Sequence, residues 1–421
     1  MNLSERDKAV NWHPYTQMKT VGDIIPIVRG EGVYLFDDQG NKYVDAVSSW
    51  WVTLHGHAHP HIAKKVSEQL HTLEQVIFAG FTHEPAVQLS ENLLKLLPEN
   101  QKKVFYSDNG STAVEVALKM CIQYAYHQNH QKTKILALKN AYHGDTFGAM
   151  SVSGRSVWTQ PFGEMLFEVV FIDAPTAQNL ESLKKFIQTI ADEIACFIYE
   201  PLVQGAAGML MYRPEDLSEL MKFCREKKIL MIQDEVFTGF GRTGNLFAAD
   251  YLSEQPDTMC FSKGLTGGTM PMGITTCSME IFNAFLSDDP YKTLFHGHSF
   301  TANPLSCAAA LASMEILLKE ETLERIDLIA EKHSEFVKIL QKHPKVEKVR
   351  QTGTILAWEI VSNQQTSYFN DIGKLLYKEF LKRGIILRPL GNVMYLVPPY
   401  CITGEELDGI YHHIIGVLDH F

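Results

Sequence analysis

The sequence lacks the features that mark membrane and secreted proteins. None of its apolar runs approaches the length that a helix needs to span a bilayer. The residues from Met1 to Lys8 contain no apolar core like that of a signal peptide. Internal repeats and low-complexity segments are also absent. We therefore expect a cytoplasmic protein with no membrane partner.

Positive charge is scarce as well. The 38 lysines and arginines are outnumbered by 49 acidic residues, which gives a net charge of −11, and no block is rich in Lys or Arg. Nucleic acids and anionic membranes bind proteins through a basic face. We therefore expect no nucleic-acid partner.

Cysteines are few and widely separated. Seven occur, and no two of them form a Cys-x-x-Cys pair. Their odd number and scatter fit reduced, mostly buried thiols in a cytoplasmic protein. They are Cys121, Cys196, Cys224, Cys260, Cys277, Cys307 and Cys401.

What the sequence does contain is a rhythm of short apolar runs separated by helical segments. Its 421 residues suffice for two domains, and its hydrophobic content of 45% is ordinary for a globular protein. Alternating strands and helices predict a mostly parallel sheet with helices on both faces. The apolar runs cover residues 103–106, 135–138, 169–172, 194–199, 229–232, 259–261 and 272–276, and the helices 113–128, 180–194 and 214–227.

The two ends of the chain are organised differently. Residues 32–47 place turn formers between two β-prone runs, which predicts a hairpin. A long helical stretch covers residues 304–341. A strand over 354–360, a helix over 371–383 and a final strand and helix follow, which indicates a smaller C-terminal α/β domain.

An acid and a lysine stand at the ends of two of the apolar runs. The run 229–232 leads to Asp234, and Lys263 follows 29 residues later, just past another run. Pyridoxal phosphate needs a lysine for its Schiff base and an anion opposite its ring nitrogen. Lys263 and Asp234 could therefore bind the two ends of the pyridine ring of that cofactor. Taken alone, Asp234 is better explained as a helix cap and Lys263 as a solvated surface residue.

A glycine and two hydroxyl residues lead into the first helix of the sheet region. Gly110, Ser111 and Thr112 follow the run 103–106. Thr112 and Glu115 have the spacing of a capping box, so free backbone N–H groups should lie near Gly110. A helix N-terminus of this kind suits a phosphate group. A plain helix cap without ligand explains the same residues.

Two further strand ends carry polar side chains. Tyr142 follows the run 135–138 and could stack on a flat ring, although a tyrosine in a surface turn explains it as well. Glu200 follows the run 194–199 and is either a functional carboxylate or a structural acid bonded to a nearby loop. Ligands of open α/β sheets bind beyond the carboxyl ends of the strands.

One glycine motif matches a dinucleotide-binding pattern, but its position in the chain does not fit that function. Gly239-x-Gly241-x-x-Gly244 matches the dinucleotide pattern, but it begins five residues after the strand-end aspartate and precedes no clear amphipathic helix. No acidic strand end follows about 20 residues further on, as nicotinamide binding requires. We interpret the motif as a flexible loop in which Arg242 is the residue of interest.

Four histidines alternate between His55 and His61. Alternate residues of an extended segment share a face, which suggests a metal site. No nearby cysteine or carboxylate completes such a site, and Pro60 is typical of a helix start. We favour a conformational loop near the active site and expect no metal.

Taken together, these motifs resemble those of the class III aminotransferases of fold type I, and the resemblance covers essentially the whole chain. The class motif is the run from Asp234 to Gly244, together with Phe261-Ser-Lys263-Gly. The resemblance implies an α/β fold, with a mostly parallel, mixed sheet flanked by helices in a large domain. A smaller α/β domain from the two chain ends completes it.

The same resemblance implies three segments. Residues 1–58 would join the small domain and the active site, residues 59–309 would form the large domain that binds pyridoxal 5'-phosphate, and residues 310–421 would form the C-terminal small domain. Lys263 resembles the Schiff-base lysine and Asp234 the partner of the pyridine nitrogen.

Further positions match the cofactor site of the class. Tyr142 resembles the ring-stacking aromatic residue, and Gly110 with Ser111 resembles the phosphate loop. Gly297 and Ser299 match a segment that reaches the phosphate from the neighbouring subunit. The resemblance therefore implies a homodimer with shared active sites.

Within the class, the chain resembles the branch that converts 7-keto-8-aminopelargonate to 7,8-diaminopelargonate in biotin biosynthesis by a ping-pong reaction. General ω-aminotransferases do not usually carry Trp12-His-Pro-Tyr15-Thr together with the pair Trp50-Trp51. The branch usually takes S-adenosyl-L-methionine as amino donor, although members that use lysine exist. The substrate residues that it implies are Tyr15, Trp50, Asp145, Arg242, Gly297 and Arg388, of which Arg388 suits a carboxylate through its planar fork.

Two positions depart from the class. The hydroxyl that reaches the phosphate is more familiar as threonine, whereas this chain has Ser299, with Thr301 nearby. Phe237 stands where many relatives carry a glutamine that touches the ring oxygen. The second departure weakens the analogy with ornithine and 4-aminobutyrate enzymes.

Four other functions compete with this expectation. The nearest is a class III aminotransferase for another ω-amino acid or diamine, followed by an aminomutase or decarboxylase of the same fold. A non-enzymatic cofactor-binding protein is disfavoured because the lysine, the aspartate and the phosphate loop are all intact. A nicotinamide oxidoreductase would rest only on the misplaced glycine pattern.

Overall fold

A seven-stranded mixed sheet forms the centre of the larger lobe of the protein. The computed structural model describes residues 1–128, 132–362, 366 and 370–420. The strand order is β4-β12-β11-β10-β7-β5-β6, in which β12 runs antiparallel to both of its neighbours and the other pairs are parallel. This confirms the expected mostly parallel, mixed sheet. Its strands are β4 (Gln101–Ser107), β5 (Lys134–Leu138), β6 (Val169–Ile172), β7 (Ile194–Tyr199), β10 (Leu230–Asp234), β11 (Thr258–Phe261) and β12 (Gly273–Ser278).

Helices cover both faces of this sheet. Successive side chains of a strand point to opposite faces. Ile135 and Ala137 of β5 accordingly pack in the cluster of α5, whereas Leu136 and Leu138 pack with α7 and α8. Because both faces are covered, β7 is buried along its whole length, which explains its continuous apolar sequence. The helices are α5 (Gly110–His127), α7 (Leu180–Ile190) and α8 (Pro214–Glu226).

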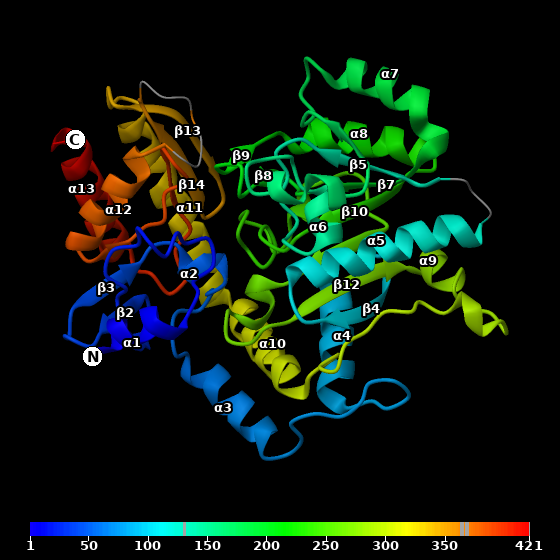
Figure 1. Cartoon of the computed structure of the whole chain (residues 1–421), viewed down its shortest axis with the longest axis horizontal. Helices are drawn as coiled ribbons and strands as arrows, with labels where there is room; N and C mark the ends of the chain where they lie inside the picture. The colour runs from blue at the N-terminus through cyan, green and yellow to red at the C-terminus, as the bar shows by residue number, and fades with distance from the viewer. Residues whose placement is uncertain (129–131, 363–365, 367–369, 421) are drawn as a thin grey trace.

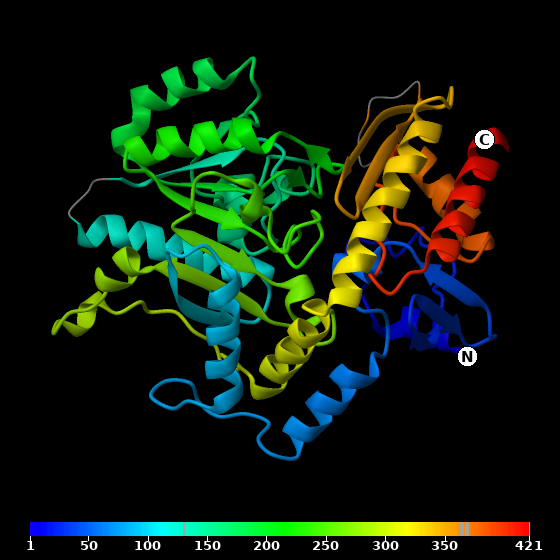
Figure 2. The ribbon, with the colours of Figure 1, turned by 180° about the vertical axis from the view of Figure 1, so that it is seen from behind.

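The smaller lobe is built from both ends of the chain, and Figures 1 and 2 show the two termini in this lobe from opposite sides. The predicted hairpin is present as β2 and β3, and β3 pairs in parallel with β15. A three-stranded sheet β13-β14-β16 lies beside it. The segment limits at residues 58 and 309 stay predictions. The elements are α1 (Leu3–Val10), β1 (Ile27–Glu31), β2 (Tyr34–Asp37), β3 (Lys42–Asp45), α11 (Glu320–Leu340), β13 (Val346–Thr352), β14 (Ile355–Ile360), α12 (Ile372–Lys382), β15 (Ile385–Ile386), β16 (Val393–Leu396) and α13 (Gly404–His420).

Shorter elements connect the two lobes and surround the sheet edge. The helical stretch expected over 304–341 is interrupted at Lys319, whose extended backbone (ψ 141°) separates α10 from α11. In the described residues, every helix is too short or too polar to cross a bilayer. The remaining elements are α2 (Ser48–Trp51), α3 (Pro60–Leu70), α4 (Glu84–Leu96), α6 (Phe147–Val152), η1 (Gln160–Met165), η2 (Ala191–Glu193), β8 (Val203–Gln204), β9 (Leu210–Met211), η3 (Ala248–Tyr251), η4 (Lys263–Thr266), α9 (Met279–Asn283), η5 (Pro290–Lys292) and α10 (Pro304–Leu317).

Two local expectations were wrong. The capping box at the start of α5 joins Asn109 to Thr112 rather than Thr112 to Glu115, because the helix begins at Gly110. Glu115 instead accepts hydrogen bonds from the first residues of α6 and from Thr146, which precedes that helix. The loop around Gly241 is not an exposed, flexible loop: Phe240 and Arg242 are 2% and 1% exposed.

Candidate active site

A cavity of about 510 Å³ opens where the parallel strands end. Such a position is expected for a ligand site in an open α/β sheet. Strands β5, β7, β10 and β11 each deliver residues to it through the loops that follow them. The described residues that line it are Trp51, Asn109, Gly110, Ser111, Tyr142, His143, Gly144, Asp145, Thr146, Glu200, Asp234, Val236, Phe237, Thr238, Ser262 and Lys263.

The carboxylate of Asp234 lies at the buried end of the cavity. It is the last residue of β10 and is 4% exposed. Its Oδ2 lies 2.6 Å from Nδ1 of His143, and its Oδ1 accepts the N–H of Val236 at 3.0 Å. Two donors from different loops therefore fix the orientation of this carboxylate.

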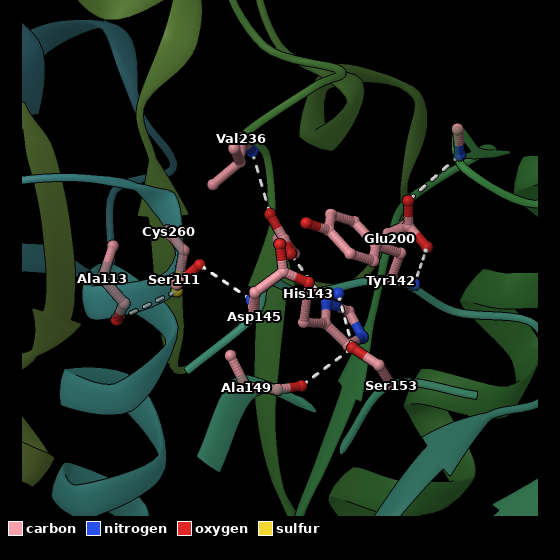
Figure 3. Close-up of polar contacts among 12 residues, drawn as sticks. Ser111, Ala113, Tyr142, His143, Asp145, Ala149, Ser153, Glu200, Val236 and Cys260 are labelled. Carbon is pink, nitrogen blue, oxygen red and sulfur yellow. Dashed lines mark hydrogen bonds and ion pairs between the residues drawn. The ribbon is translucent and has the colours of Figure 1, made fainter. Parts of the chain in front are cut away.

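His143 is a residue that sequence reasoning left without a role. Its backbone N–H donates to Oγ of Ser153 at 2.9 Å, and the Ser153 hydroxyl donates to the carbonyl of Ala149 at 2.8 Å, as Figure 3 shows. This chain of bonds holds the imidazole over the end of β10. The only signal in the sequence was its place beside Tyr142 at a strand end.

Lys263 stands on the other side of the cavity, directly after β11. Its Nζ lies 4.9 Å from the ring centroid of Trp51 and 5.7 Å from that of Phe237. In the described ranges this amine has no ion-pair partner within 4.0 Å. Burial lowers the pKa of Lys263, while Asp234 and Glu200 oppose the shift. A lysine whose pKa is lowered by burial is a more available nucleophile.

Glu200 positions the loop that carries Tyr142. The carboxylate is 5% exposed and accepts the backbone N–H of Tyr142 at 3.0 Å and that of Gly205 at 3.1 Å. Burial raises the pKa of Glu200 to about 7. Figure 3 shows the carboxylate beside Tyr142. The structural explanation of Glu200, which the sequence left open, is therefore supported by its contacts.

The N-terminus of α5 supplies backbone N–H groups at the opposite end of the cavity. Gly110 packs so closely that a Cβ there would lie 2.8 Å from Val236. Ser111 accepts the N–H of Asp145 through Oγ at 3.2 Å. Gly144 has φ +131°, and a Cβ there would lie 2.0 Å from Ser111 Oγ. Glycine is thus required at both positions for the loops to meet.

Tyr15, Trp50 and Arg388 are not among the described lining residues, but Tyr15 contacts two residues that are, Tyr142 and Asp145, and we call this aromatic and charged group the mouth of the cavity. The Tyr15 hydroxyl donates to Oδ2 of Asp145 at 2.5 Å and lies 3.3 Å from the hydroxyl of Tyr142. Burial raises the pKa of Tyr142. The Tyr15 and Trp50 rings are 5.6 Å apart, and the guanidinium of Arg388 lies 4.0 Å from the Trp50 centroid. Five residues predicted from the sequence therefore come together here.

Arg242 lies outside this group. Its guanidinium donates to the carbonyl of Pro398 at 2.8 Å and, over 3.4 and 3.5 Å, to those of Trp51 and Thr53. Burial lowers the pKa of Arg242, and Tyr400 and Asp45 oppose the shift. A buried guanidinium needs such acceptors. We therefore assign Arg242 to the packing of the segment around Trp51 rather than to substrate binding.

Gly297 and Ser299 are not among the described residues that line this cavity. Both are exposed, and the carbonyl of Ser299 accepts a bond from Gln75 at 2.7 Å. Within one chain they are therefore surface residues, as expected for a segment that would act in a neighbouring subunit.

Three of the four alternating histidines have different polar partners, and the ring of His59 contacts that of His55. His55 lies 2.9 Å from Ser313 Oγ, His57 3.0 Å from Asp45, and His61 2.6 Å from Glu315. Pro60 does begin α3. Across the described residues, no group of three or more His, Cys, Asp or Glu side chains is arranged to hold a metal ion.

Comparison with known proteins decides the family. The model described as Aminotransferase class-III matches residues 16–418. The chain belongs to the class III aminotransferases. The adenosylmethionine-8-amino-7-oxononanoate aminotransferase of Synechococcus elongatus is 47% identical, covering 97% of this chain and 98% of its own length. That of Helicobacter pylori is 36% identical and covers 99% and 98%.

Solved structures agree with this assignment. The adenosylmethionine-8-amino-7-oxononanoate aminotransferase of Methanocaldococcus jannaschii has a TM-score of 0.96 at 37% identity, covering 99% of this chain and 98% of its own. A PMP-bound aminotransferase from Vibrio fluvialis has a TM-score of 0.93 at 27% identity, covering 100% and 98%. The aminotransferase is therefore a pyridoxal phosphate-dependent enzyme that acts on small molecules.

The cavity fits this cofactor on the evidence of its own residues. A buried carboxylate, a lysine amine with no ion pair among the described residues, and the N-terminus of an 18-residue helix surround one space. They match the ring nitrogen, the aldehyde and the phosphate of the cofactor, respectively. Each polar group of pyridoxal phosphate thus has a chemically suitable partner in the cavity.

Proposed function

We propose that this aminotransferase converts 7-keto-8-aminopelargonate (8-amino-7-oxononanoate) to 7,8-diaminopelargonate in biotin biosynthesis. The observation that carries the proposal is the placement of Arg388 over Trp50, beside Tyr15, at the mouth of the cavity. The acceptor has a carboxylate at the end of an apolar chain, and this group of residues offers a cation and aromatic surface. Relatives that bear the corresponding name support it.

The cofactor is held, in this proposal, by residues from four loops. Gly110 and Ser111 bind the phosphate through the start of α5. Tyr142 would stack on the ring, and the Asp234 carboxylate would favour the charged form of the ring nitrogen. Lys263 would hold the cofactor covalently. When bound, pyridoxal phosphate withdraws electrons from the substrate, which makes the C–H bond beside the transferred amine acidic.

Lys263 also moves the proton. The incoming amino substrate displaces Lys263 from its covalent link, and because burial lowers the pKa of Lys263, the freed amine can exist in the neutral form that accepts a proton from the substrate carbon. The same group returns that proton as an acid when the keto substrate is converted. The rings of Trp51 and Phe237 keep water from the amine, since both contact the space around Nζ.

Substrate orientation is assigned to the mouth of the cavity. Arg388 binds the distal carboxylate of the acceptor, while Trp50 and Tyr15 contact its apolar chain. Asp145, held by the Tyr15 hydroxyl, faces the same opening and carries a negative charge suited to an amino group. S-adenosyl-L-methionine is the proposed amino donor.

The active enzyme is proposed to be a cytoplasmic homodimer. Support comes from Gly297 and Ser299, which are exposed in one chain although their segment resembles one that reaches a neighbouring phosphate. Each active site would then draw Ser299 from the partner copy. The three chain segments 1–58, 59–309 and 310–421 remain the proposed division into domains.

A second candidate is an ω-aminotransferase for another amine. Structures described as ω-transaminases from Pseudomonas jessenii and Thermomicrobium roseum match at 27% and 29% identity. An exchange assay decides between the two. Purified enzyme is given 7-keto-8-aminopelargonate with S-adenosyl-L-methionine, lysine or a simple amine, and amine-for-ketone exchange is followed by mass spectrometry.

We expect 7,8-diaminopelargonate to form with S-adenosyl-L-methionine. Half-reactions with each donor, followed as the loss of the visible absorbance band, identify the donor independently of the acceptor. Turnover of simple amines with no use of the keto acid would replace the proposal with the second candidate.

A further inference from the structure

The tandem tryptophans are carried by a turn with an unusual backbone. Ser48, Ser49 and Trp51 have φ values of 50°, 60° and 66°. Residues with a side chain avoid this left-handed region because Cβ approaches the neighbouring carbonyl oxygen. Three such residues within four positions do not adopt it from local preference. Contacts outside the turn must therefore hold it.

Asp45 supplies two of these contacts, beside those between Ser48 and Val397 and between Trp51 and Arg242. Its side chain is completely buried at the end of β3. Oδ1 accepts the N–H of Val47 at 3.1 Å, and Oδ2 accepts the N–H of Ser49 at 2.6 Å. The carboxylate thus binds the backbone on both sides of the first strained residue.

His57 holds Asp45 from the other side. Its Nε2 lies 3.0 Å from Oδ2 of Asp45, and since a carboxylate only accepts, the imidazole donates. The position of the imidazole is set by the β1–β2 turn. The N–H of His57 donates to the carbonyl of Gly32 at 2.7 Å, and a Cβ at Gly30 would lie 2.6 Å from the Cβ of His57.

The turn determines where two functional rings stand. Trp51 lines the cavity and lies 4.9 Å from Nζ of Lys263. Trp50 points to the mouth, where the guanidinium of Arg388 lies 4.0 Å from its centroid. Because the two residues are adjacent, a rotation of the turn displaces both rings together.

We propose that Asp45 and His57 are positioning residues that hold the Ser48–Trp51 turn, and that through Trp50 they set the affinity for the keto acceptor. As far as the acceptor is concerned, this inference rests on the proposed function. The inference assigns a positioning role to His57, one of the four alternating histidines. His61 is in a different environment, since its imidazole pairs with Glu315 at the surface.

The test compares four single variants. His57→Leu removes the donor. His57→Gln keeps it, because the amide nitrogen of glutamine can occupy the place of Nε2. Asp45→Asn replaces one acceptor with a donor while keeping the side-chain shape. His61→Leu is the matched control, since it breaks a histidine–carboxylate pair of the same segment away from the turn.

The first readout needs no cofactor and no substrate. Hydrogen exchange of a peptide covering residues 46–52 is measured by mass spectrometry in the cofactor-free protein. Because one hydrogen bond to a charged group is lost, we expect exchange about tenfold faster in His57→Leu and Asp45→Asn. His57→Gln and His61→Leu should exchange at the wild-type rate. Unchanged exchange in both His57→Leu and Asp45→Asn would overturn the inference.

The second readout is kinetic. With Trp50 displaced beside Arg388, KM for the keto acceptor should rise about tenfold in His57→Leu, and kcat should fall by less than KM rises, from the displaced Trp51 ring beside Lys263. His57→Gln should restore KM. A tenfold fall of kcat with KM unchanged would mean that Asp45 and His57 do not act through acceptor binding, and this result would also overturn the inference. If the wild-type enzyme does not use this acceptor, the proposed function fails, while the exchange readout still tests the turn.

Discussion

His143 and Asp234 are 91 positions apart in the sequence, yet Nδ1 of one lies 2.6 Å from Oδ2 of the other. The contact is possible because β5 and β10 both pair with β7, which places their carboxyl ends at the same edge. It provides the carboxylate that we propose faces the ring nitrogen with a donor from outside its own loop. The other donor is the N–H of Val236.

Removing the donor of His143 should slow the chemistry. In His143→Leu, Asp234 loses a hydrogen bond to a charged group, worth about 1.5–3 kcal/mol, which corresponds to a fall in kcat/KM of roughly 10- to 100-fold. His143→Asn is the matched control, because its amide nitrogen can replace Nδ1. A His143→Leu enzyme with wild-type kcat/KM would show that this contact has no part in catalysis.

Asp234→Asn should retain cofactor and lose most of its rate. The helix N-terminus and Lys263 are unaffected, so cofactor absorbance persists. An amide cannot supply the charge that favours a protonated ring nitrogen, and kcat should fall about 100-fold or more. Stopped-flow measurement of the donor half-reaction checks the rate. Near-normal turnover would remove the electronic role of Asp234.

Lys263→Ala should abolish both turnover and the covalent link. No other described lysine lines the cavity, so no amine can replace it there. We expect the visible absorbance band that borohydride bleaches to be missing from the variant. Its retained folding is checked by near-ultraviolet circular dichroism. Transamination by this variant would exclude the proposed role.

Arg388→Leu should weaken acceptor binding alone. Loss of a bidentate bond to a carboxylate, worth about 1.5–3 kcal/mol, should raise KM for the keto acid roughly 10- to 100-fold. The half-reaction with the amino donor should proceed at the wild-type rate if the donor carboxylate uses other groups. Arg213→Leu is the control, because that side chain is 67% exposed and pairs only with nearby acids. An equal effect on both half-reactions would contradict this assignment.

Glu235 should make the protein less stable as the pH rises. Burial raises the pKa of its carboxyl group to about 7 from the ordinary 4.5, although Thr238, Gln233 and Ala249 all donate to it. Between these pH values the folded state binds the proton more tightly than the unfolded state does. Stability from this group is therefore complete below about pH 4.5 and lost as the pH rises through about 7.

Urea unfolding of the cofactor-free protein from pH 4.5 to 7 measures the effect. The difference between wild type and Glu235→Gln should change by at most about 3 kcal/mol over this range, since one pKa unit is worth about 1.4 kcal/mol. Glu164→Gln, at an exposed position, is the control. Parallel pH profiles for wild type and Glu235→Gln would contradict the prediction.

Much of the active site could be predicted because the sequence shows where its buried strands end. Apolar runs that stop at Asp234, or just before Lys263, identified the sheet edge, and local pattern sufficed for this. Local pattern failed at Thr112, where the capping partner proved to be Asn109, because a helix start is uncertain by a few residues. It also left the role of Arg242 open, because the motif indicates a functional loop but not the direction of the guanidinium.

The linear order of residues predicted the alternation of strands and helices, and its motifs, through their resemblance to class III aminotransferases, predicted the cofactor and the side chains available for a carboxylate substrate. Those properties depend on residue type and on short-range periodicity. Which side chains meet depended on the folded sheet, because contacts between β5, β7 and β10 join residues that are 58 to 91 positions apart. The roles of His143, Glu200 and Asp45 appeared only there, since hydrogen bonding to a buried carboxylate is decided by packing.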